Sequence, residues 1–341
     1  MEQSRQPPDL IGQSPVFQNA LTHASAAAAL DRPLLICGER GSGKELIAAR
    51  VHYLSPRWEA PFVKLNCAAL AEELLDSELF GHEAGAFTGA TKRHAGRFER
   101  AEGGTLFLDE IASASLRIQE KLLRIIEYGE YERVGGEATR YANVRIVAAA
   151  NIDLPGLAAA GKFRADLLDR LAFDVIQAPP LRARRDDIPL LAAHFAAAMA
   201  NEMEAQYEGF SSSAMQALIA HDWPGNVREL KNTAERSLYR WLAKSRRGPI
   251  DDIVLDPFAG AHRAPSSLAN QTASAAPPAE LPPALRYDFR KELDRVEKRW
   301  ADDALALSGW NQRATAKALG LSYDQMRGLI RKHKLKAQTT T

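Results

Sequence analysis

Short apolar runs alternate with longer stretches of helical periodicity through the first half of the chain. Five runs have the length and composition of buried strands: 34–37, 61–66, 104–110, 144–151 and 173–176. The stretches around them that favour helices are 10–33, 44–53, 70–80 and 116–127. Because strands that alternate with helices pack as a mostly parallel sheet, the pattern predicts an α/β fold for this half.

The pattern changes after Pro179-Pro180, where strand signals stop. Three stretches then predict a small α-helical subdomain: 188–203, 212–221 and 226–242. Residues 257–284 are rich in Ala, Pro and Ser, which is typical of a linker. A charged helix and two shorter helices follow. We therefore expect four parts: an α/β subdomain (1–178), an α-helical subdomain (179–256), a flexible linker (257–284) and a small all-α domain (285–341).

The composition places the chain among water-soluble proteins with more than one domain. It has 341 residues, of which 46% are hydrophobic and 26% are charged. No apolar run approaches the roughly 20 residues of a membrane span, so we expect no membrane insertion. The polar N-terminus argues against export. Cys37 and Cys67 lie in or beside apolar runs, where buried thiols are expected rather than a disulfide, and a cytoplasmic protein fits.

The net charge of +1 hides an uneven distribution. From Leu285 to the C-terminus there are 13 Lys and Arg against 7 Asp and Glu, a net charge of +6. The remaining residues carry 31 basic against 36 acidic side chains, a net charge of −5. A basic module on a mildly acidic body indicates that polyanion binding is concentrated at the C-terminal end.

A glycine-rich segment follows the first predicted strand and opens the next helix. Its residues are Gly38, Glu39, Arg40, Gly41, Ser42, Gly43, Lys44 and Glu45. The spacing is that of a phosphate-binding loop, in which glycines let backbone N–H groups turn inward, the helix N-terminus attracts anions and the lysine reaches the terminal phosphates. Glu45 stands where Ser or Thr usually ligates Mg²⁺. The alternative is a glycine-rich turn with an unrelated lysine.

Two predicted strand ends carry side chains suited to phosphate chemistry. The third strand ends in Asp109, which can hold Mg²⁺, and Glu110, which can orient and deprotonate an attacking water. The fourth ends in Asn151, which can sense a γ-phosphate. A polar strand end at the surface and an ordinary turn asparagine are the alternatives. Because the loop and the carboxylates occur in the order that the chemistry needs, the sequence predicts nucleotide hydrolysis.

A glycine-punctuated insertion at 81–90 fits neither helical nor strand periodicity. It contains the hexapeptide Gly85-Ala86-Phe87-Thr88-Gly89-Ala90. With this hexapeptide the chain resembles the bacterial enhancer-binding proteins, which are AAA+ activators of σ54-RNA polymerase. Other segments that carry the resemblance are 38–45, 77–83, 103–110, 132–136 and 223–230. Glu45 matches the usual phosphate loop of this family, so it is no longer an exception.

The resemblance implies an ATPase of AAA+ fold, with ATP and Mg²⁺ bound between the subunits of a ring that is usually a hexamer. Lys44 would match the phosphate-loop lysine, Asp109 the residue linked to Mg²⁺ and Glu110 the catalytic glutamate. Asn66 would match an asparagine that holds the glutamate until the γ-phosphate is read. Ala150, before the sensor asparagine, departs from the Thr that the family commonly has there.

Three arginines are implied to respond to the nucleotide. Arg164 and Arg170 match fingers that enter the neighbouring subunit's site, where a guanidinium stabilises charge on the transferring phosphoryl group. Arg228 matches an arginine that couples the helical lid to nucleotide state. The alternative for the first two is pairing with Asp166 and Asp169 on their own helix.

The hexapeptide implies a second function for the insertion. Phe87 and Thr88 would lie at a loop tip above the ring and contact σ54, with the other hexapeptide residues in the same contact. Residues 130–138 would form a second loop that supports it. An exposed Phe between glycines fits this role better than a place in a core.

Residues 312–332 have the plan of a helix-turn-helix. Gly320 allows the turn, Ser322 can cap the second helix, and the residues expected to face inward are 314, 316, 318 and 319. The side chains expected to meet a major groove and its phosphates are Arg313, Ser322, Tyr323, Gln325, Arg327, Arg331 and Lys332. The segment resembles the Fis-type domain, which implies a dimerising helix at 285–307 and binding to double-stranded enhancer DNA. The alternative is a helical bundle with a solvated basic face.

The absence of an N-terminal receiver or sensor domain makes the chain similar to the phage shock type of activator within this family. That similarity implies control by another protein, a negative regulator such as phage shock protein A. Trp58, between Arg57 and Glu59, is a candidate contact, because large aromatic residues in polar loops often anchor a partner. The alternative is a tryptophan folded back onto its own domain.

The sequence therefore predicts an ATP-hydrolysing transcription activator that binds enhancer DNA and converts closed σ54-RNA polymerase complexes to open ones. Two other classes stay open. One is an AAA+ remodeller that threads polypeptide, against which the hexapeptide and the basic C-terminal part argue. The other is a DNA-binding repressor with a vestigial ATPase, against which the intact Asp109 and Glu110 argue.

Overall fold

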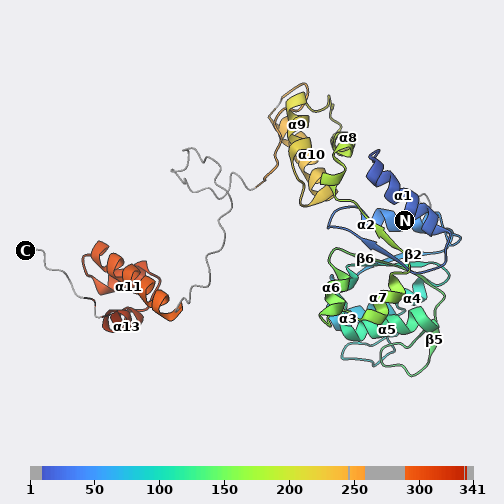
Figure 1. Cartoon of the computed structure of the whole chain (residues 1–341), viewed down its shortest axis with the longest axis horizontal. Helices are drawn as coiled ribbons and strands as arrows, with labels where there is room; N and C mark the ends of the chain where they lie inside the picture. Colours follow the sequence, from blue (N-terminus) through green and yellow to red (C-terminus); the bar gives the residue numbers. More distant parts are fainter. Residues whose placement is uncertain (1–9, 245, 258–288, 334, 336–341) are drawn as a thin grey trace, which may run out of the picture. The chain divides into compact units, whose positions relative to one another are not determined.

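The computed structural model describes residues 10–244, 246–257, 289–333 and 335. The chain divides into two compact units, 1–263 and 264–341 (Figure 1). Almost all of the predicted linker at 257–284 lies outside the described residues. Each unit is described by itself below.

The first unit alternates helices and strands and then becomes helical. Its α/β part contains α1 (Pro15–Ala28), β1 (Leu34–Cys37), α2 (Lys44–Tyr53), β2 (Phe62–Asn66), α3 (Glu72–Phe80), α4 (Arg97–Arg100), β3 (Thr105–Asp109), η1 (Ile111–Ser113), α5 (Leu116–Tyr128), β4 (Glu130–Tyr131), β5 (Arg140–Tyr141), β6 (Arg145–Ala150), α6 (Leu154–Ala159), α7 (Ala165–Leu171) and β7 (Val175–Gln177). Its helical part contains η2 (Leu181–Ala183), η3 (Arg185–Asp187), α8 (Ile188–Glu202), α9 (Ser212–Ala220) and α10 (Asn226–Ala243).

The five predicted strands form one parallel sheet in the order β2-β3-β6-β1-β7. β1 occupies an interior position, with Leu34 opposite Val147 of β6 and Leu35 opposite Val175 of β7. This arrangement confirms the predicted α/β class. The two-stranded β4–β5 hairpin was not predicted, because two-residue strands have too little periodicity to detect.

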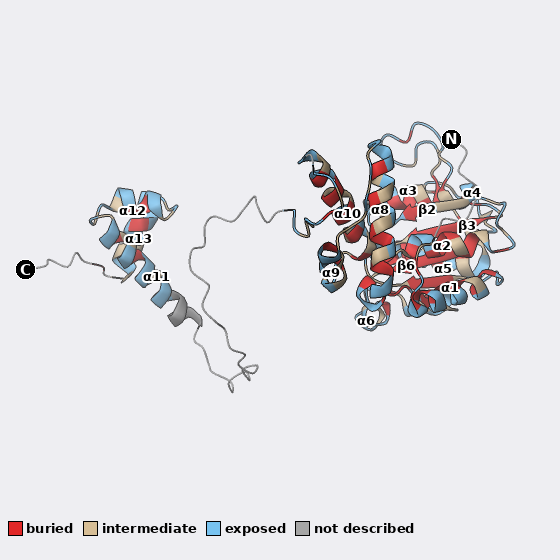
Figure 2. Cartoon of the chain, turned by 90° about the horizontal axis from the view of Figure 1, so that it is seen from above, coloured by how far each residue is buried: buried red, intermediate tan, exposed pale blue. Residues whose placement is uncertain are grey.

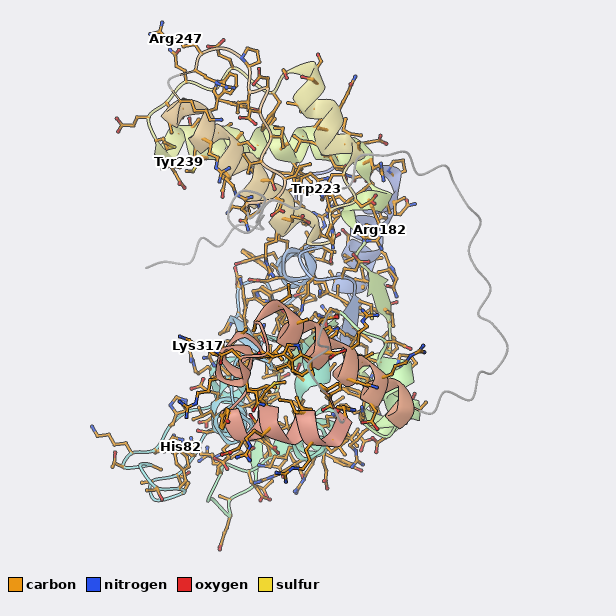
Figure 3. All side chains as sticks on the ribbon, turned by 90° about the vertical axis from the view of Figure 1, so that its left-hand side faces the viewer. His82, Arg182, Trp223, Tyr239, Arg247 and Lys317 are labelled. Atoms are coloured by element: carbon orange, nitrogen blue, oxygen red, sulfur yellow. The ribbon has the colours of Figure 1, made fainter. Side chains whose placement is uncertain are left out.

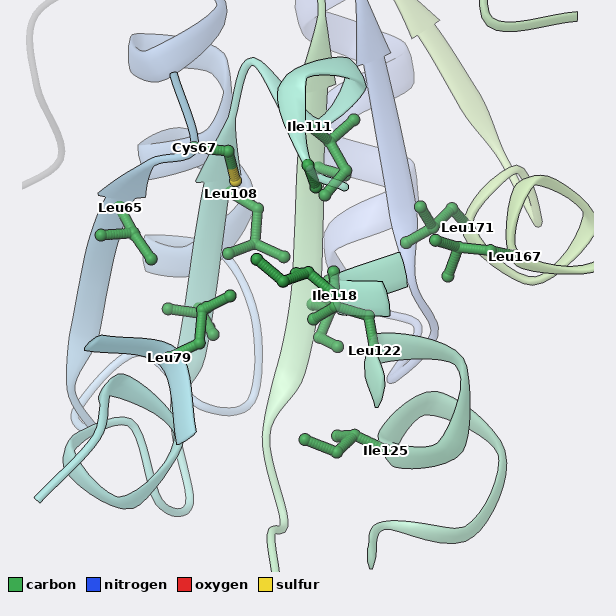
Figure 4. Close-up of a cluster of buried hydrophobic side chains, with 14 of the residues drawn as sticks. Leu65, Cys67, Leu79, Leu108, Ile111, Ile118, Leu122, Ile125, Leu167 and Leu171 are labelled. Atoms are coloured by element: carbon green, nitrogen blue, oxygen red, sulfur yellow. The ribbon is translucent and has the colours of Figure 1, made fainter. Parts of the chain in front are cut away.

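The core lies on both faces of this sheet, since neighbouring residues of a strand point to opposite sides. Leu34 and Ile36 of β1 belong to the cluster that covers α1 and α2, whereas Leu35 belongs to the cluster under α3, α5 and α7. Figure 4 shows part of the second cluster, and Figure 2 shows buried positions gathered on the strands and the inward helix faces. Continuous apolar strands therefore suit a sheet covered on both sides.

The amphipathic pattern of α5 explains how this helix packs. The Ser115 hydroxyl accepts from Ile118 N at its start, and Gly129, with φ of 71°, ends it in a left-handed conformation. Ile118, Leu122 and Ile125 face the sheet and are buried. The predicted boundary at 116–127 is confirmed to within one residue.

The helical part has its own core around Trp223, which is fully buried. The indole N–H of Trp223 donates to Leu218 O at 2.9 Å, so the polar atom of this large side chain is satisfied. The Ser211 hydroxyl accepts from Ala214 N at the start of α9. The three helices predicted for 188–242 are present, each within two residues of its expected ends.

The second unit contains α11 (Phe289–Leu307), α12 (Gln312–Ala318) and α13 (Tyr323–His333). Its small core consists of Ala301, Leu305, Ala316, Met326 and Leu335. The predicted inward pattern of α12 is partly wrong: positions 314 and 318 are exposed, whereas 315 is buried. Position 315 is the threonine whose hydroxyl donates to Asn311 O, so its polar atom is satisfied inside. No helix in the described ranges is long and apolar enough to cross a membrane.

Candidate active site and interaction surfaces

The phosphate loop connects β1 to α2 at the carboxyl end of the sheet. Gly41 and Gly43 have φ of 74° and 100°, a left-handed backbone that glycine adopts without strain. Gly38 N donates to Ala150 O at 3.1 Å, which joins the loop to the end of β6. α2 begins directly after the loop at Lys44, so its N-terminal N–H groups face the loop interior. The geometry is that of an anion cradle.

Lys44 holds its ammonium group inside this cradle. Its Nζ donates to Gly38 O and to Glu39 O, each at 2.9 Å. Burial lowers the pKa of Lys44, and the nearby carboxylates of Asp109 and Glu110 oppose that shift. A positive charge is therefore fixed within reach of the two predicted acidic residues.

Asp109 and Glu110 follow one another at the end of β3. Asp109 Oδ1 accepts from Glu110 N at 2.9 Å, and burial raises the pKa of the Asp109 carboxyl. Glu110 has φ of 51°, and its carboxylate pairs with Arg40, with Nη2 3.3 Å from Oε2. A left-handed non-glycine residue at a strand end marks a strained position of the kind found at functional sites.

The asparagines have different partners from those that the resemblance implies. Asn66 lies opposite Asp109 in the β2–β3 register, but its Oδ1 accepts from Ala68 N at 2.8 Å. The carboxylate of Glu110 pairs with Arg40 instead, and no hydrogen bond joins it to Asn66 among the described residues. Asn151 directly follows β6, beside the start of the phosphate loop.

The two predicted finger arginines lie at either end of α7. The Arg164 guanidinium pairs with Asp166 at 2.7 Å, as in the alternative given for it. Arg170 pairs with Glu127 of α5 at 2.9 Å rather than with Asp169. Both guanidinium groups retain exposed surface, which keeps them accessible to a neighbouring subunit.

The helical part contacts the phosphate loop directly, next to Arg228, the residue predicted to couple the lid to nucleotide state. Val227 N donates to Gly41 O at 3.0 Å, and a Cβ built on Gly41 would lie 2.4 Å from Gly225 O. Asn226 is buried with φ of 53°, and its amide nitrogen donates to Glu39 Oε2 and to Arg40 O, each at 3.0 Å. The loop and the first turn of α10 therefore form one packed unit.

Two further arginines complete this contact, and the sequence reasoning missed both. Arg182 Nη1 donates to Glu39 Oε2 at 2.8 Å, and hydrogen bonds from Arg182 and Asn226 hold the pKa of Glu39 at about 2. Arg184 is buried, donates to Ser42 O at 3.0 Å and stacks over Phe17 at 4.4 Å. Figure 3 labels Arg182 between the helical part and the sheet. No local motif predicts contacts between residues 140 or more positions apart.

A small, mainly apolar cavity of about 70 Å³ opens beside Gly43. Its walls come from the N-terminal segment, the phosphate loop and the helical part: Leu10, Ile11, Phe17, Ser42, Gly43, Leu46, Arg184, Leu191, Phe195 and Val227. Apolar walls next to an anion cradle suit a ligand with both a flat ring and phosphates.

The predicted loop at 85–90 lies in the segment that connects α3 to α4. Gly85 N donates to Ala90 O at 2.7 Å, and Ala90 N donates to Phe87 O at 2.9 Å, so the tip is a compact turn. Phe87 is 43% exposed. Thr88 and Gly89 are exposed as well. A large apolar side chain is thus presented to a partner.

Residues 130–138 contact this loop. Glu83 N donates to Val134 O at 3.1 Å, and a Cβ built on Gly135 would lie 2.7 Å from Cβ of Ala86. The side chain of Arg133 is buried and pairs with Glu83 at 2.6 Å and with Glu99 at 2.8 Å. Hydrogen bonds from Arg133 also lower the pKa of Glu83.

In the second unit, the helix-turn-helix side chains divide into two groups. Ser322 and Gln325 form a reciprocal cap at the start of α13, with Gln325 N donating to Ser322 Oγ at 3.2 Å. Tyr323 is exposed, and the guanidinium groups of Arg313 and Arg327 lie 5.5 and 5.9 Å from its ring centre. These side chains, together with the exposed Arg331, form one basic, aromatic surface.

Lys332 lies in the second group, although it was expected to face DNA. Its Nζ pairs with Asp294 of α11 at 2.7 Å and also with Glu297. His333 contacts the same Glu297 at 3.0 Å. The physical reason is that α13 packs on α11, whose acidic side chains neutralise the end of α13.

Trp58 lies in the turn between α2 and β2 and is 47% exposed. The neighbouring Arg57 pairs with Asp31 and fixes the turn. The side chain of Trp58 is therefore available to a partner on the outer surface of the α/β part.

This fold and site define an AAA+ ATPase: a phosphate loop and two strand-end carboxylates on a parallel sheet, joined to a helical lid. The chain matches the Sigma-54 interaction domain over residues 10–177 and the AAA+ ATPase lid domain over residues 182–247. It belongs to the σ54-dependent transcriptional activators of the AAA+ ATPase family, as its relatives also indicate.

Two relatives illustrate this membership. The chain is 52% identical over 328 residues to the Psp operon transcriptional activator of Escherichia coli K12, covering 96% of this chain and 98% of the relative. It is 44% identical over 317 residues to the Nif-specific regulatory protein of Azotobacter vinelandii, covering 93% of this chain and 57% of the relative. The predicted family and function are thus confirmed.

Solved structures agree with this assignment. The crystal structure of NtrX from Brucella abortus in complex with ATP superposes with a TM-score of 0.68 at 30% identity, covering 96% of this chain and 70% of that chain. NtrX in complex with ADP gives a TM-score of 0.68 as well. ATP binding by this domain type, which the sequence predicts, is confirmed at the level of the family.

Proposed function

We propose that the chain hydrolyses ATP between the subunits of a hexameric ring and uses the energy to open σ54-RNA polymerase promoter complexes from an enhancer site. The observation that carries the proposal is the convergence of Lys44, Asp109 and Glu110 at the carboxyl edge of the sheet. An anion cradle beside two carboxylates is what phosphoryl transfer to water requires. Similarity to the Psp operon activator supports a phage shock operon as the target.

Mg²⁺ fits the donor set at this edge. Asp109 and Glu110 offer carboxylate oxygens, which are the ligands that Mg²⁺ prefers. In the described part of the chain, Oδ1 of Asp109 accepts from Glu110 N, and Oε2 of Glu110 accepts from Arg40. Bound Mg²⁺ would neutralise charge on the phosphates. Asp109 would hold it, and binding would also remove the cost of the buried carboxylate, whose pKa is raised by burial.

The residues of the chain divide the chemistry among them. On ATP binding, Lys44 would exchange its hydrogen bonds to Gly38 O and Glu39 O for hydrogen bonds to phosphate oxygens. Glu110 would separate from Arg40 and accept a proton from the attacking water. Arg164 and Arg170 reach the neighbouring site, where a guanidinium stabilises the transferring phosphoryl group. Asn66 and Asn151 lie at the ends of β2 and β6, on either side of β3, and would read the γ-phosphate from there.

The adenine ring would enter the apolar cavity beside Gly43. This cavity is lined by both the sheet part and the helical part, so a bound base ties them together. Arg228, one residue after the Val227 contact, then responds to the phosphates. The phosphate loop, from Gly38 to Glu45, would hold the β- and γ-phosphates through its backbone N–H groups.

The loop at 85–90 would transmit the result to σ54. Hydrogen bonds and the Arg133 ion pairs join it to residues 130–138, so both loops move together. The exposed Phe87 and Thr88 supply the contact. An apolar ring at the tip of a turn can insert into a partner's groove.

Two other partners complete the proposal. The basic surface of α12 and α13 would bind double-stranded enhancer DNA, with α11 pairing two copies. A negative regulator such as phage shock protein A would bind at the exposed Trp58, in line with the similarity to the Psp operon activator.

The test is open-complex formation by σ54 holoenzyme on a promoter with an upstream enhancer. We expect the wild-type chain to open the promoter with ATP and not with a non-hydrolysable analogue. Glu110→Gln should bind ATP but lose turnover by roughly 10²–10⁴-fold, since it removes the base. Glu235→Gln, which alters the partly exposed pair with Lys231 on α10, is the matched control. Promoter opening by Glu110→Gln at the wild-type rate would refute the proposal.

A further inference from the structure

The segment that carries Phe87 leaves and re-enters the fold at a narrow neck. His82 N donates to His94 O at 3.2 Å, and His94 N donates to His82 O at 3.0 Å, so the two ends of the segment pair with each other. His82 also forms a parallel bridge with Val134 of the supporting loop. Figure 3 labels His82 in this region. His82 therefore belongs to the rigid part of the fold rather than to the tip.

The imidazole ring of His82 is fixed by both of its nitrogens. Nδ1 lies 2.7 Å from Oγ of Ser77, which is buried on α3, and Nε2 lies 3.1 Å from Lys92 O. A carbonyl oxygen can only accept, so Nε2 carries a hydrogen and donates it to Lys92 O. These two bonds define one ring orientation.

The fixed ring is the support for Phe87. The Phe87 ring meets it edge-on, with centroids 4.9 Å apart and planes at 66°, and the His94 ring stacks beside it at 5.4 Å. Within the described ranges, His82 is the aromatic residue in contact with Phe87. Backbone hydrogen bonds hold the turn itself, but the flanking Gly85 and Gly89 have open space around them and offer no side chain to hold the Phe87 ring.

We propose that His82 is a positioning residue that seats Phe87 for contact with σ54. The hydrogen bonds to Ser77 and Lys92 hold the imidazole still, and the imidazole face holds the phenyl ring. Without this seat, Phe87 would sample many positions on its glycine-flanked turn and would have to be ordered on binding. This inference rests on the proposed role of Phe87.

The experiment measures binding of purified σ54 to the full-length chain in the presence of ADP and aluminium fluoride. His82→Ala should weaken binding about two- to tenfold, the size expected for loss of one aromatic contact. His82→Phe keeps a ring under Phe87 without the hydrogen bonds, and His82→Asn keeps polar groups without the ring. We expect His82→Phe to restore more than half of the lost affinity and His82→Asn to restore little. ATP turnover of all three should equal that of the wild type, since His82 is remote from Lys44 and Glu110.

The outcomes separate the two proposals. If Phe87→Ala leaves σ54 binding unchanged, the proposed function of the loop is wrong. If Phe87→Ala abolishes binding but His82→Ala binds as well as the wild type, only the seating role is wrong. Restoration by His82→Asn but not by His82→Phe would also overturn it, because the side-chain hydrogen bonds rather than the ring would then be the cause. If a variant has altered ATP turnover, its thermal unfolding is compared with that of the wild type. If His82→Phe then no longer unfolds cooperatively, His82 is needed for folding rather than for seating Phe87, and the inference is wrong.

Discussion

At the scale of single residues, the α/β part buries several polar side chains and satisfies each by a specific partner. Arg145, at the start of β6, is buried and donates to Ala27 O, Ala28 O and Arg32 O, so it caps the end of α1. His52 is buried on α2 between Thr105, which it contacts at 3.0 Å, and Phe62, on which it stacks. Buried titratable groups such as His52 make the free energy of unfolding depend on pH, which apolar contacts do not.

His52 gives a prediction about pH. Burial lowers its pKa from 6.5 to about 4, so the folded chain favours neutral imidazole while the unfolded chain takes up a proton below pH 6.5. The stability contributed by His52 is therefore complete above pH 6.5 and is lost as the pH falls toward 4. We expect about 2 kcal/mol of this loss between about pH 7.5 and pH 5. Urea unfolding at both pH values measures it.

His52→Gln is the matched control, because it keeps a polar side chain that does not titrate. The difference in unfolding free energy between wild type and His52→Gln should shrink on acidification. A difference that stays constant with pH would show that His52 is not the group responsible.

Sequence reasoning at this scale proposed residues for the chemistry but did not predict their partners. Lys44, Asp109 and Glu110 follow from local motifs, and the structure places them at one edge of the sheet. That Arg40 pairs with Glu110 depends on how two loops 70 positions apart meet, which no local pattern encodes. Asn66 illustrates the same limit, since its Oδ1 accepts from Ala68 N, a bond that the sequence did not predict.

At the scale of elements, the strands were predicted well because a sheet covered on both faces needs continuous apolar runs. The elements that were missed are short, among them α4, α6 and the β4–β5 hairpin. The helix-turn-helix was placed correctly, but the inward face of α12 was wrong at 314, 315 and 318. A seven-residue helix has too few turns to fix its rotation from composition alone.

The start of α10 gives a prediction about the lid. Asn226→Ala removes the acceptor of Leu181 N and places alanine at φ of 53°. We expect a loss of about 2–4 kcal/mol in unfolding free energy, from the unpaired N–H and the strained backbone together. The KM for ATP should rise about tenfold, because Glu39 and the Arg40 carbonyl lose a donor.

Asn226→Gly separates the two effects. Glycine adopts positive φ without strain, so it should be more stable than Asn226→Ala by about 1 kcal/mol while showing the same KM. If Asn226→Gly had the KM of the wild type, the hydrogen bonds to the phosphate loop would not position it.

The recognition helix gives a prediction about salt dependence. Arg313 and Arg327 flank Tyr323 on the exposed surface, whereas Lys332 is neutralised by Asp294 and Glu297. Arg313→Ala or Arg327→Ala should reduce the slope of log K against log salt by about 1.

Lys332→Ala is the internal comparison for this measurement. This variant should change the slope by much less than the arginine variants do. Asp294 and Glu297 already neutralise Lys332, so Lys332 contributes little to the release of counterions from DNA. Fluorescence anisotropy on enhancer DNA over a salt series gives the values. Equal slopes for Lys332→Ala and Arg313→Ala would place Lys332 on phosphate instead.

At the scale of the whole molecule, the proposed ATPase residues and the proposed DNA-binding residues lie in different units. The first unit holds the nucleotide residues and the Phe87 loop, and the second unit holds the basic recognition surface. In the proposed function, several copies share one reaction, because Arg164 and Arg170 would act in the site of a neighbouring copy.

Mixed assemblies test that sharing. Lys44→Ala and Arg170→Ala each remove one half of a composite site, so each alone should lose ATP turnover by about 10³-fold or more. On random co-assembly about one interface in four joins an intact lysine to an intact arginine from different copies. An equimolar mixture should therefore recover about a quarter of the wild-type turnover. Phosphate release, with co-assembly checked by gel filtration, measures it, and an inactive mixture that co-assembles would refute hydrolysis in trans.

The carboxylate of Asp187 has a consequence for engineered fusions. It accepts from Gln13 N, Ser14 N and the Ser14 hydroxyl, and so ties the strand of chain before α1 to the base of the lid. A domain fused before Leu10 would therefore act on the contact between the sheet part and the lid rather than on the sheet itself. If that domain changed conformation on binding a ligand, the ligand would control ATP turnover.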